Sequence, residues 1–104
     1  MTDFYLGLMS GTSLDGIDAV LVAFGDDKVQ LLAQSYLAFD EAIRLELLAL
    51  HTPCANELHR SLLMGNQLAR LYATSINQLL TQAHVNADQV RAIGCHGQTI
   101  RHCP

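Results

Sequence analysis

The sequence contains no tryptophan, two prolines, three cysteines and six basic residues among 104, with a net charge of −4. The basic residues form no cluster, which argues against nucleic-acid binding and against a basic membrane-binding face. No apolar run approaches the roughly 18 residues of a membrane span. Asp3 stands where a secretory signal would be basic. Three scattered cysteines favour a reducing compartment over a disulfide scaffold. We therefore expect a cytoplasmic protein without nucleic-acid or membrane partners.

Half of the residues are hydrophobic, enough for the core of one domain at this length. Three apolar runs separated by turn residues predict an antiparallel β-meander, with strands at Phe4–Met9, Ile17–Phe24 and Val29–Phe39. Gly25-Asp26-Asp27 is typical of the tight turn between the last two. In the third run, alternation places four residues on one face: Val29, Leu31, Ala33 and Ser35.

Helical spacing follows the meander. Asp40 is a suitable N-cap for a helix reaching about His51, which Pro53 would end. A longer helix of about 40 Å is predicted from about Ala55 to Ala83. Its apolar residues recur at steps of three and four and predict one continuous buried stripe: Leu58, Leu62, Gly65, Ala69, Tyr72, Ile76 and Leu79. We expect Gly65 to mark a close backbone neighbour.

Val90–Cys95 is predicted to form a fourth, buried strand after a turn at Asn86. The order of three strands, two helices and a strand predicts an α/β fold with a mixed sheet. This fourth strand ends at His96-Gly97-Gln98-Thr99. Open α/β sheets bind ligands at the carboxyl ends of their strands, so this turn is a candidate binding site. Gln98 and Thr99 offer donors and acceptors that suit sugar hydroxyls, although a structural turn is the simpler interpretation.

The stretch between the first two strands is rich in small and hydroxyl residues. Ser10, Thr12 and Ser13 supply hydroxyl donors, while Gly11 and Gly16 allow positive φ and leave room for a ligand. Successive backbone N–H groups in such a loop can hold an anion. An ordinary hairpin loop is the alternative. The stretch matches neither a Walker A loop, nor a G-x-G-x-x-G fingerprint, nor a serine nucleophile elbow.

Two carboxylates accompany this loop, and either could contact Mg²⁺ or its bound waters. Asp15 lies at the predicted loop tip, and Asp18 lies at the start of the second strand. Asp18 could equally hold the loop by accepting hydrogen bonds from its N–H groups. A zinc site is not favoured, because the spacing of the nearby cysteines and histidines fits no zinc pattern: Cys95, His96, His102 and Cys103.

Two segments together resemble a known family. Gly7–Asp18 resembles the N-terminal signature of anhydro-N-acetylmuramic acid kinases, and Ile93–Pro104 resembles their I-G-x-H-G-Q-T-I-x-H-x-P motif. The resemblance implies part of an actin/Hsp70/hexokinase-like (ribonuclease H-like) fold. It also implies that ATP, with Mg²⁺, phosphorylates a 1,6-anhydro amino sugar while the anhydro ring is opened by water.

The resemblance carries over to individual positions. It implies an ATP-binding stretch of eight residues: Gly11, Thr12, Ser13, Leu14, Asp15, Gly16, Ile17 and Asp18. It implies sugar contacts at His96, Gly97, Gln98 and Thr99. The family's catalytic base and adenosine pocket lie in later segments, so no catalytic residue is expected within residues 1–104.

Members of this family are much longer, so residues 1–104 are expected to be the N-terminal portion of the first of two domains. Such a portion leaves apolar surface uncovered, and a homodimer is one candidate assembly. A non-catalytic ligand-binding or interaction module with the same half-fold is the main alternative. A different sugar kinase or acetate-type kinase is less favoured, because both motifs occur together.

We predict that the 104-residue chain alone does not transfer phosphate, because the implied catalytic base is absent from it. The measurement is ADP release from Mg-ATP by the purified chain with the anhydro sugar present. ADP formation above a buffer blank would contradict this prediction.

Overall fold

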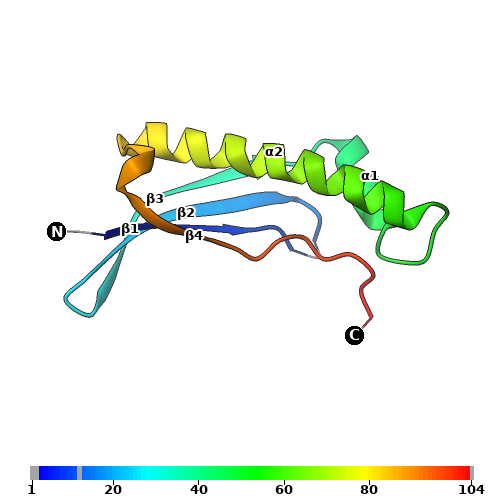
Figure 1. Cartoon of the computed structure of the whole chain (residues 1–104), viewed down its shortest axis with the longest axis horizontal. Helices are drawn as coiled ribbons and strands as arrows, with labels where there is room; N and C mark the ends of the chain where they lie inside the picture. The colour runs from blue at the N-terminus through cyan, green and yellow to red at the C-terminus, as the bar shows by residue number, and fades with distance from the viewer. Residues whose placement is uncertain (1–2, 12, 104) are drawn as a thin grey trace.

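The computed structural model describes residues 3–11 and 13–103. Its elements are β1 (Asp3–Met9), β2 (Gly16–Gly25), β3 (Lys28–Ala38), α1 (Glu41–Ala49), α2 (Glu57–Ala83), the short 3₁₀ helix η1 (Ala87–Gln89) and β4 (Val90–Cys95) (Figure 1). The strand order is β3-β2-β1-β4. β1 and β2 pair antiparallel, as do β2 and β3, whereas β1 and β4 are parallel. The predicted meander and mixed sheet are confirmed, and the arrangement is consistent with part of a ribonuclease H-like fold.

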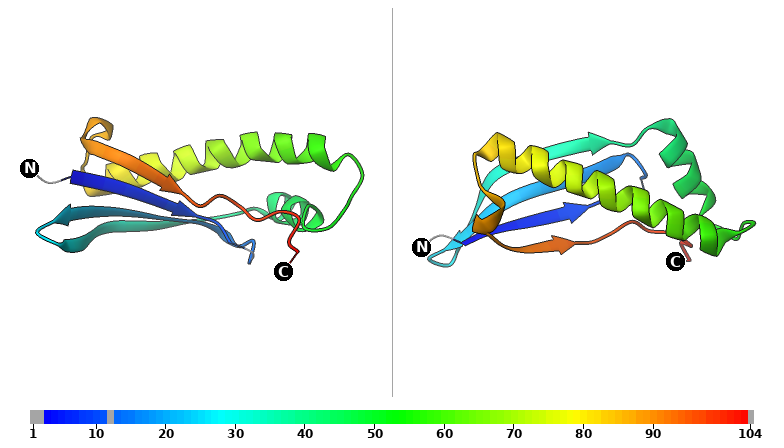
Figure 2. Two further views of the ribbon diagram at one scale, coloured as in Figure 1. Left: turned by 60° about the horizontal axis from the view of Figure 1, so that its bottom comes forward. Right: turned by 45° about the horizontal axis from the view of Figure 1, so that its top comes forward.

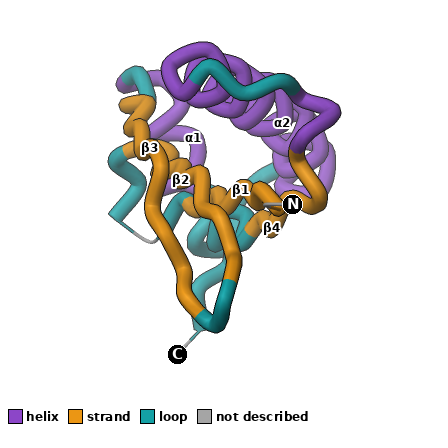
Figure 3. Tube along the Cα trace, turned by 90° about the vertical axis from the view of Figure 1, so that its left-hand side faces the viewer, coloured by secondary structure: helices purple, strands orange, loops and turns teal. Residues whose placement is uncertain are grey.

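The molecule has two layers. α2 crosses one face of the sheet diagonally, and α1 packs beside its N-terminal half on the same side (Figure 2). Viewed end on, both helices lie on one side of the strands, and no helix of the described residues covers the other side (Figure 3). No helix within the described ranges is both long and apolar enough to cross a membrane.

The apolar interior forms two adjoining clusters beneath α2. One joins the sheet to the C-terminal half of α2 through buried residues: Leu6, Leu8, Ile17, Ala19, Leu21, Leu79 and Leu80. The other joins the β1–β2 loop to α1 and the N-terminal half of α2: Leu14, Leu47, Leu50, Met64 and Leu68. Phe39, Leu71 and Tyr72 pack against both clusters.

Local signals in the sequence set most element ends. Asp40 caps α1 as predicted, since its carboxylate accepts a hydrogen bond from the N–H of Ile43 at 2.9 Å. The predicted turn after β2 is a two-residue turn in which Asp26 and Asp27 both have positive φ. That geometry matches the twist of a β-hairpin. α2 begins at Glu57, two residues later than predicted, after Asn56 with φ 55°.

Three predictions about which residues share a face or are buried are wrong. In β3, Ala33 pairs with Leu21 but Leu31 pairs with Val22, so a register shift between them divides the predicted single face. Neighbouring residues of β2 point to opposite sides, which puts Leu31 on the open face and Ala33 toward α2. β4 is an edge strand, and five of its six residues are exposed rather than buried.

The third correction concerns α2. The N-terminal part of the predicted stripe faces solvent, with Leu58 73 % exposed and Leu62 62 % exposed. The buried positions there are Met64 and Leu68, because α1 lies on a neighbouring side of the helix. A Cβ added at Gly65 would have no described atom within 4 Å, so the expected close neighbour is not found among the described residues.

Gly16 is the glycine that the fold requires. A Cβ at this position would lie 2.3 Å from the carbonyl oxygen of Leu37 and 2.9 Å from the Cα of Ala38, both in β3. Neither backbone atom can move without separating the strands. The glycine therefore permits the close pairing of β2 with β3.

Gly16→Ala should lower the free energy of unfolding by about 3 kcal/mol or prevent folding, because the methyl group overlaps backbone. Gly65→Ala is the matched control and should raise stability by about 0.5–1 kcal/mol, since the site is open and helical. Thermal unfolding of both variants is the measurement. Equal stability of Gly16→Ala and the parent protein would contradict the close strand pairing.

Candidate functional site

The loop from Ser10 to Asp15 joins β1 to β2 at one end of the sheet. A hydrogen bond of 3.3 Å from the N–H of Leu14 to the carbonyl oxygen of Gly11 closes it. A second bond of 2.9 Å, from the N–H of Phe39 to the carbonyl oxygen of Asp15, attaches it to the end of β3. One backbone contact thus closes the loop on itself, and the other attaches its C-terminal end to the end of β3.

Leu14 anchors the loop in the core. Its side chain is only 3 % exposed and belongs to the cluster under α1 and α2. Its φ is 60°, a left-handed conformation that costs a bulky residue energy and recurs at functional loops. Leu14 and the fully buried Ile17 were both predicted in the nucleotide stretch, but neither side chain is available to a ligand.

The positive φ that was predicted for the two glycines occurs at another residue of the loop. Neither Gly11 nor Gly16 has a positive φ, whereas Leu14 does. A Cβ at Gly11 would come no closer to a described atom than 3.8 Å, at Cε of Met9. Gly11 thus leaves open space beside the loop, as predicted, while the space beside Gly16 is filled by β3.

Several backbone N–H groups of the loop have no hydrogen-bond partner in the part of the chain that the structure describes. No hydrogen bond among the described residues uses the N–H groups of Gly11, Ser13 or Asp15. Ser13 is exposed, so its hydroxyl is also accessible. The predicted contact Thr12 lies outside the described residues. A loop with several unpaired N–H groups fits the phosphate groups of a nucleotide.

Asp15 lies at the end of the loop, and Asp18 lies in β2 opposite Tyr36 of β3. Both are exposed, and their negative charges reach the phenol of Tyr36. Partial desolvation raises the pKa of Tyr36, and the two carboxylates raise it further. Asp18 pairs with Tyr36 across the strands and lines an open cavity of about 390 Å³ with it.

These two carboxylates fit a magnesium ion that is completed by phosphate oxygens and water, since Mg²⁺ is usually held by one or two carboxylates. Within the described ranges, no group of three or more histidine, cysteine, aspartate or glutamate residues could hold a metal by itself. Among the described residues, no hydrogen bond to the Asp18 carboxylate is found, so its two interpretations, as a metal ligand or as a support of the loop, both remain predictions.

The second candidate segment follows β4. The N–H of His96 donates to the carbonyl oxygen of Leu8 at 3.0 Å and prolongs the parallel pairing of β4 with β1. Gly97 then turns the chain with φ 84°, a conformation that favours glycine. His96 is exposed, and Gln98 and Thr99 are half-buried. Parallel pairing brings this turn beside the glycine-rich loop, because both strands end at the same edge.

Two contacts connect the loop and the turn directly. The side-chain amide of Gln98 donates to the carbonyl oxygen of Gly11 at 2.8 Å and to that of Thr99 at 3.2 Å. The hydroxyl of Ser10 donates to the carbonyl oxygen of Gly97 at 3.3 Å. Ser10, predicted as a donor to a ligand, is 1 % exposed and donates its hydrogen bond within the protein instead. The structure thus brings the two predicted segments into direct contact.

Tyr72 also contacts this site, which its assignment to the apolar stripe did not predict. Its phenol oxygen lies 2.8 Å from the hydroxyl of Ser10. Helical spacing assigns Tyr72 to the apolar stripe, and its ring does pack between the two clusters. A tyrosine instead of a leucine at such a position was the signal, since a buried phenol needs a hydrogen-bond partner.

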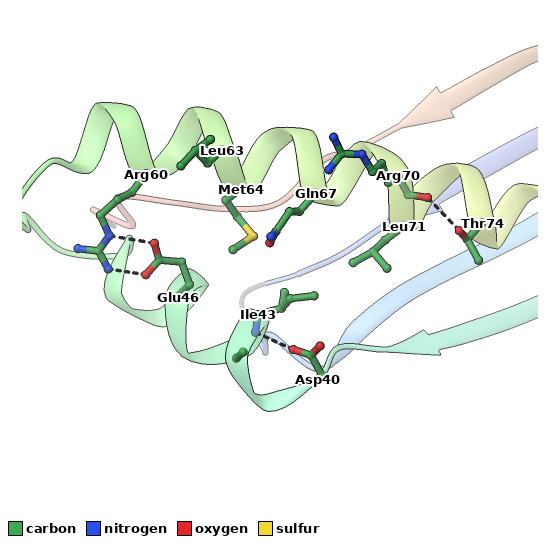
Figure 4. Close-up of a pocket in the computed structure, with 11 residues that line it drawn as sticks. Asp40, Ile43, Glu46, Arg60, Leu63, Met64, Gln67, Arg70, Leu71 and Thr74 are labelled. Carbon is green, nitrogen blue, oxygen red and sulfur yellow. Dashed lines mark hydrogen bonds and ion pairs between the residues drawn. The ribbon is translucent and has the colours of Figure 1, made fainter.

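A pocket of about 540 Å³ lies elsewhere, between α1 and α2 (Figure 4). The ion pair between Arg60 and Glu46 borders one end of it. Met64 and Leu71 form part of its apolar wall. None of the predicted nucleotide or sugar contacts lines this pocket.

Comparison with known proteins adds a family assignment. The sequence model of the anhydro-N-acetylmuramic acid kinase family matches residues 3–104. A protein named anhydro-N-acetylmuramic acid kinase from Nitrosospira multiformis is 55% identical over 101 residues, which are 97% of this chain and 28% of that protein. The protein of the same name from Variovorax paradoxus is 53% identical over 98% of this chain and 27% of its own length. The chain thus spans little more than a quarter of these curated relatives.

Gln98→Glu should lower the free energy of unfolding by about 1–3 kcal/mol, because a carboxylate oxygen would then face two carbonyl oxygens in place of an N–H donor. Gln78→Glu makes the same change on an exposed side of α2 and should have little effect. Denaturant unfolding of both variants is the measurement. A loss no larger than that of the control would argue against the link between Gln98 and Gly11.

Proposed function

Because the chain belongs to the anhydro-N-acetylmuramic acid kinase family, we propose that it is the N-terminal part of the first domain of a two-domain, ATP-dependent kinase of 1,6-anhydro-N-acetylmuramic acid. The observation that carries the proposal is the direct contact between the two predicted binding segments. Gln98 bonds to Gly11, so a nucleotide at the loop and a sugar at the turn would be neighbours.

The glycine-rich loop would bind the ATP phosphates. Its N–H groups at Gly11, Ser13 and Asp15, which have no partner among the described residues, are suited to phosphate oxygens. Asp15 and Asp18 would hold Mg²⁺, which supplies charge neutralisation to the transferring phosphoryl group when bound. Leu14 and Gly16 keep this loop in place through the core and through β3.

The turn would bind the anhydro sugar. The exposed imidazole of His96 and the half-buried Thr99 offer groups for sugar hydroxyls, and Gly97 lets backbone approach closely. Gln98 uses its amide group within the protein, and its side-chain carbonyl oxygen has no partner among the described residues. We therefore assign the amide of Gln98 to holding the sugar turn against the loop, and its carbonyl oxygen remains a proposed acceptor for a sugar hydroxyl.

In the proposed reaction, water adds to C1 of the sugar and the bond from C1 to O6 breaks. O6 then takes the γ-phosphoryl group, ADP leaves, and the proton of the water passes to a base outside residues 1–104. The product is N-acetylmuramic acid 6-phosphate, an intermediate in cell-wall recycling. We place the enzyme in the cytoplasm, where ATP is available and its three free thiols would stay reduced.

A coupled ADP-release assay on the product of the complete open reading frame tests this function. Turnover with Mg-ATP and 1,6-anhydro-N-acetylmuramic acid, but not with N-acetylglucosamine, is the expected result. A folded protein that binds ATP yet turns over neither sugar would instead support a non-catalytic binding module.

Asp15→Asn and Asp18→Asn should each lower kcat/KM by at least about tenfold, because each removes a charge proposed to hold Mg²⁺. Asp88→Asn, an exposed change in η1, is the control and should keep the parent rate. Initial rates across a range of Mg²⁺ concentrations separate the two hypotheses for Asp18. A metal ligand shifts the magnesium requirement upward, whereas a residue that only holds the loop lowers stability and leaves this requirement unchanged.

A further inference from the structure

A chain of two hydroxyl groups connects α2 to both binding segments. The phenol of Tyr72 contacts the Ser10 hydroxyl at 2.8 Å, and that hydroxyl donates to the carbonyl oxygen of Gly97 at 3.3 Å. A hydroxyl group has one hydrogen to donate. Since Ser10 gives its hydrogen to Gly97, Tyr72 must be the donor to Ser10. The chain therefore has one direction, from the helix through the loop to the turn.

The position of Tyr72 is fixed by packing. Its ring lies against both core clusters, between the sheet and α1. Burial raises the pKa of the Tyr72 phenol, although the bond to Ser10 acts in the opposite direction. The phenol is thus protonated at neutral pH and able to donate. Ser10, at 1 % exposure, is sheltered from solvent that could replace this bond.

The hydroxyl chain reinforces a second link. Ser10 and Gly11 are adjacent in the loop, and they bond to Gly97 and Gln98, which are adjacent in the turn. One contact would allow the two segments to pivot about it, whereas two neighbouring contacts hold both their distance and their orientation. Of these two contacts, the one made by Ser10 is also supported from a third element, α2.

We propose that Tyr72 is a positioning residue which, acting through Ser10, holds the glycine-rich loop at a fixed distance from the His96–Thr99 turn. This inference rests on the proposed function, in which the loop carries the phosphate donor and the turn carries the acceptor sugar. Phosphoryl transfer depends mainly on such positioning, and small displacements slow it strongly. Tyr72 touches neither substrate in this scheme.

Amide hydrogen exchange tests the physical part of the proposal without any reaction. In the product of the complete open reading frame, Tyr72→Phe should raise exchange about tenfold at the hydrogen-bonded amides of Leu14 in the loop and His96 before the turn, since both segments lose a support. Tyr5→Phe is the matched control, because it also removes a phenol. Tyr5 lies on the face of β1 that points away from α2, where its ring contacts Phe24. Faster exchange in the loop alone, or equal effects of both variants, would overturn the proposal.

Steady-state kinetics test its consequence for the reaction. Tyr72→Phe should lower kcat about tenfold while the KM values for ATP and sugar stay within about twofold, because positioning acts after both substrates are bound. A purely structural role would instead lower the thermal midpoint and the active fraction together. Unchanged kcat in a folded Tyr72→Phe variant would overturn the proposal.

Ser10→Ala supplies a second, independent variant. If Tyr72 acts through Ser10, adding Tyr72→Phe to Ser10→Ala should cause no further loss of kcat or exchange protection. Multiplicative losses in the double variant would show that Tyr72 acts by another route. Absence of sugar turnover in the parent protein would overturn the proposed function, while the exchange comparison would still decide the role of Tyr72.

Discussion

The parallel pairing of β1 with β4 is the constraint on which the site depends. It aligns Leu8 with Cys95 and so brings the two segments that follow these strands to one edge of the sheet. β4 is also parallel to β3, the strand before it in the chain, so the connection between them must run back along the sheet, and α2 supplies most of it with 27 residues. The helix that makes the crossover also buries the sheet and carries Tyr72 to the site. One connection therefore accounts for the fold, the core and the meeting of loop and turn.

At the candidate site, residue types alone do not show which polar groups are available to a ligand and which hold the protein together. Leu14 has the strained backbone conformation, while the neighbouring Gly16 is needed for contact with β3. Ser10 and Gln98 look like ligand-binding groups but donate their hydrogens to carbonyl groups of the protein. The groups left for ligands are the backbone N–H donors, the exposed carboxylates and the turn residues beside them. Polar residues in the motifs thus serve partly to hold other residues in place.

Much of the fold was predictable because the signals are local. Strand runs, the Asp40 cap and the hairpin turn at Asp26 each depend on a few consecutive residues. The motifs also indicated the two segments that the structure brings into contact. The predictions that were wrong concern features set by neighbouring elements. The bulge in β3 depends on its pairing with β2, and the buried side of α2 depends on where α1 lies. The exposure of β4 depends on what lies beyond it, and no pattern within six residues contains that information.

The contacts that join loop and turn also connect distant parts of the chain: 87 positions separate Gly11 from Gln98, and 62 separate Ser10 from Tyr72. Closing so long a segment is entropically costly, so these contacts form late, after the local hairpin. Synthesis imposes the same order, since at about 5–20 residues per second the turn emerges several seconds after the loop. The glycine-rich loop of the nascent chain therefore lacks its contact with Gln98 until the turn has been synthesised. The proposed nucleotide loop is thus completed only at the end of this segment's folding.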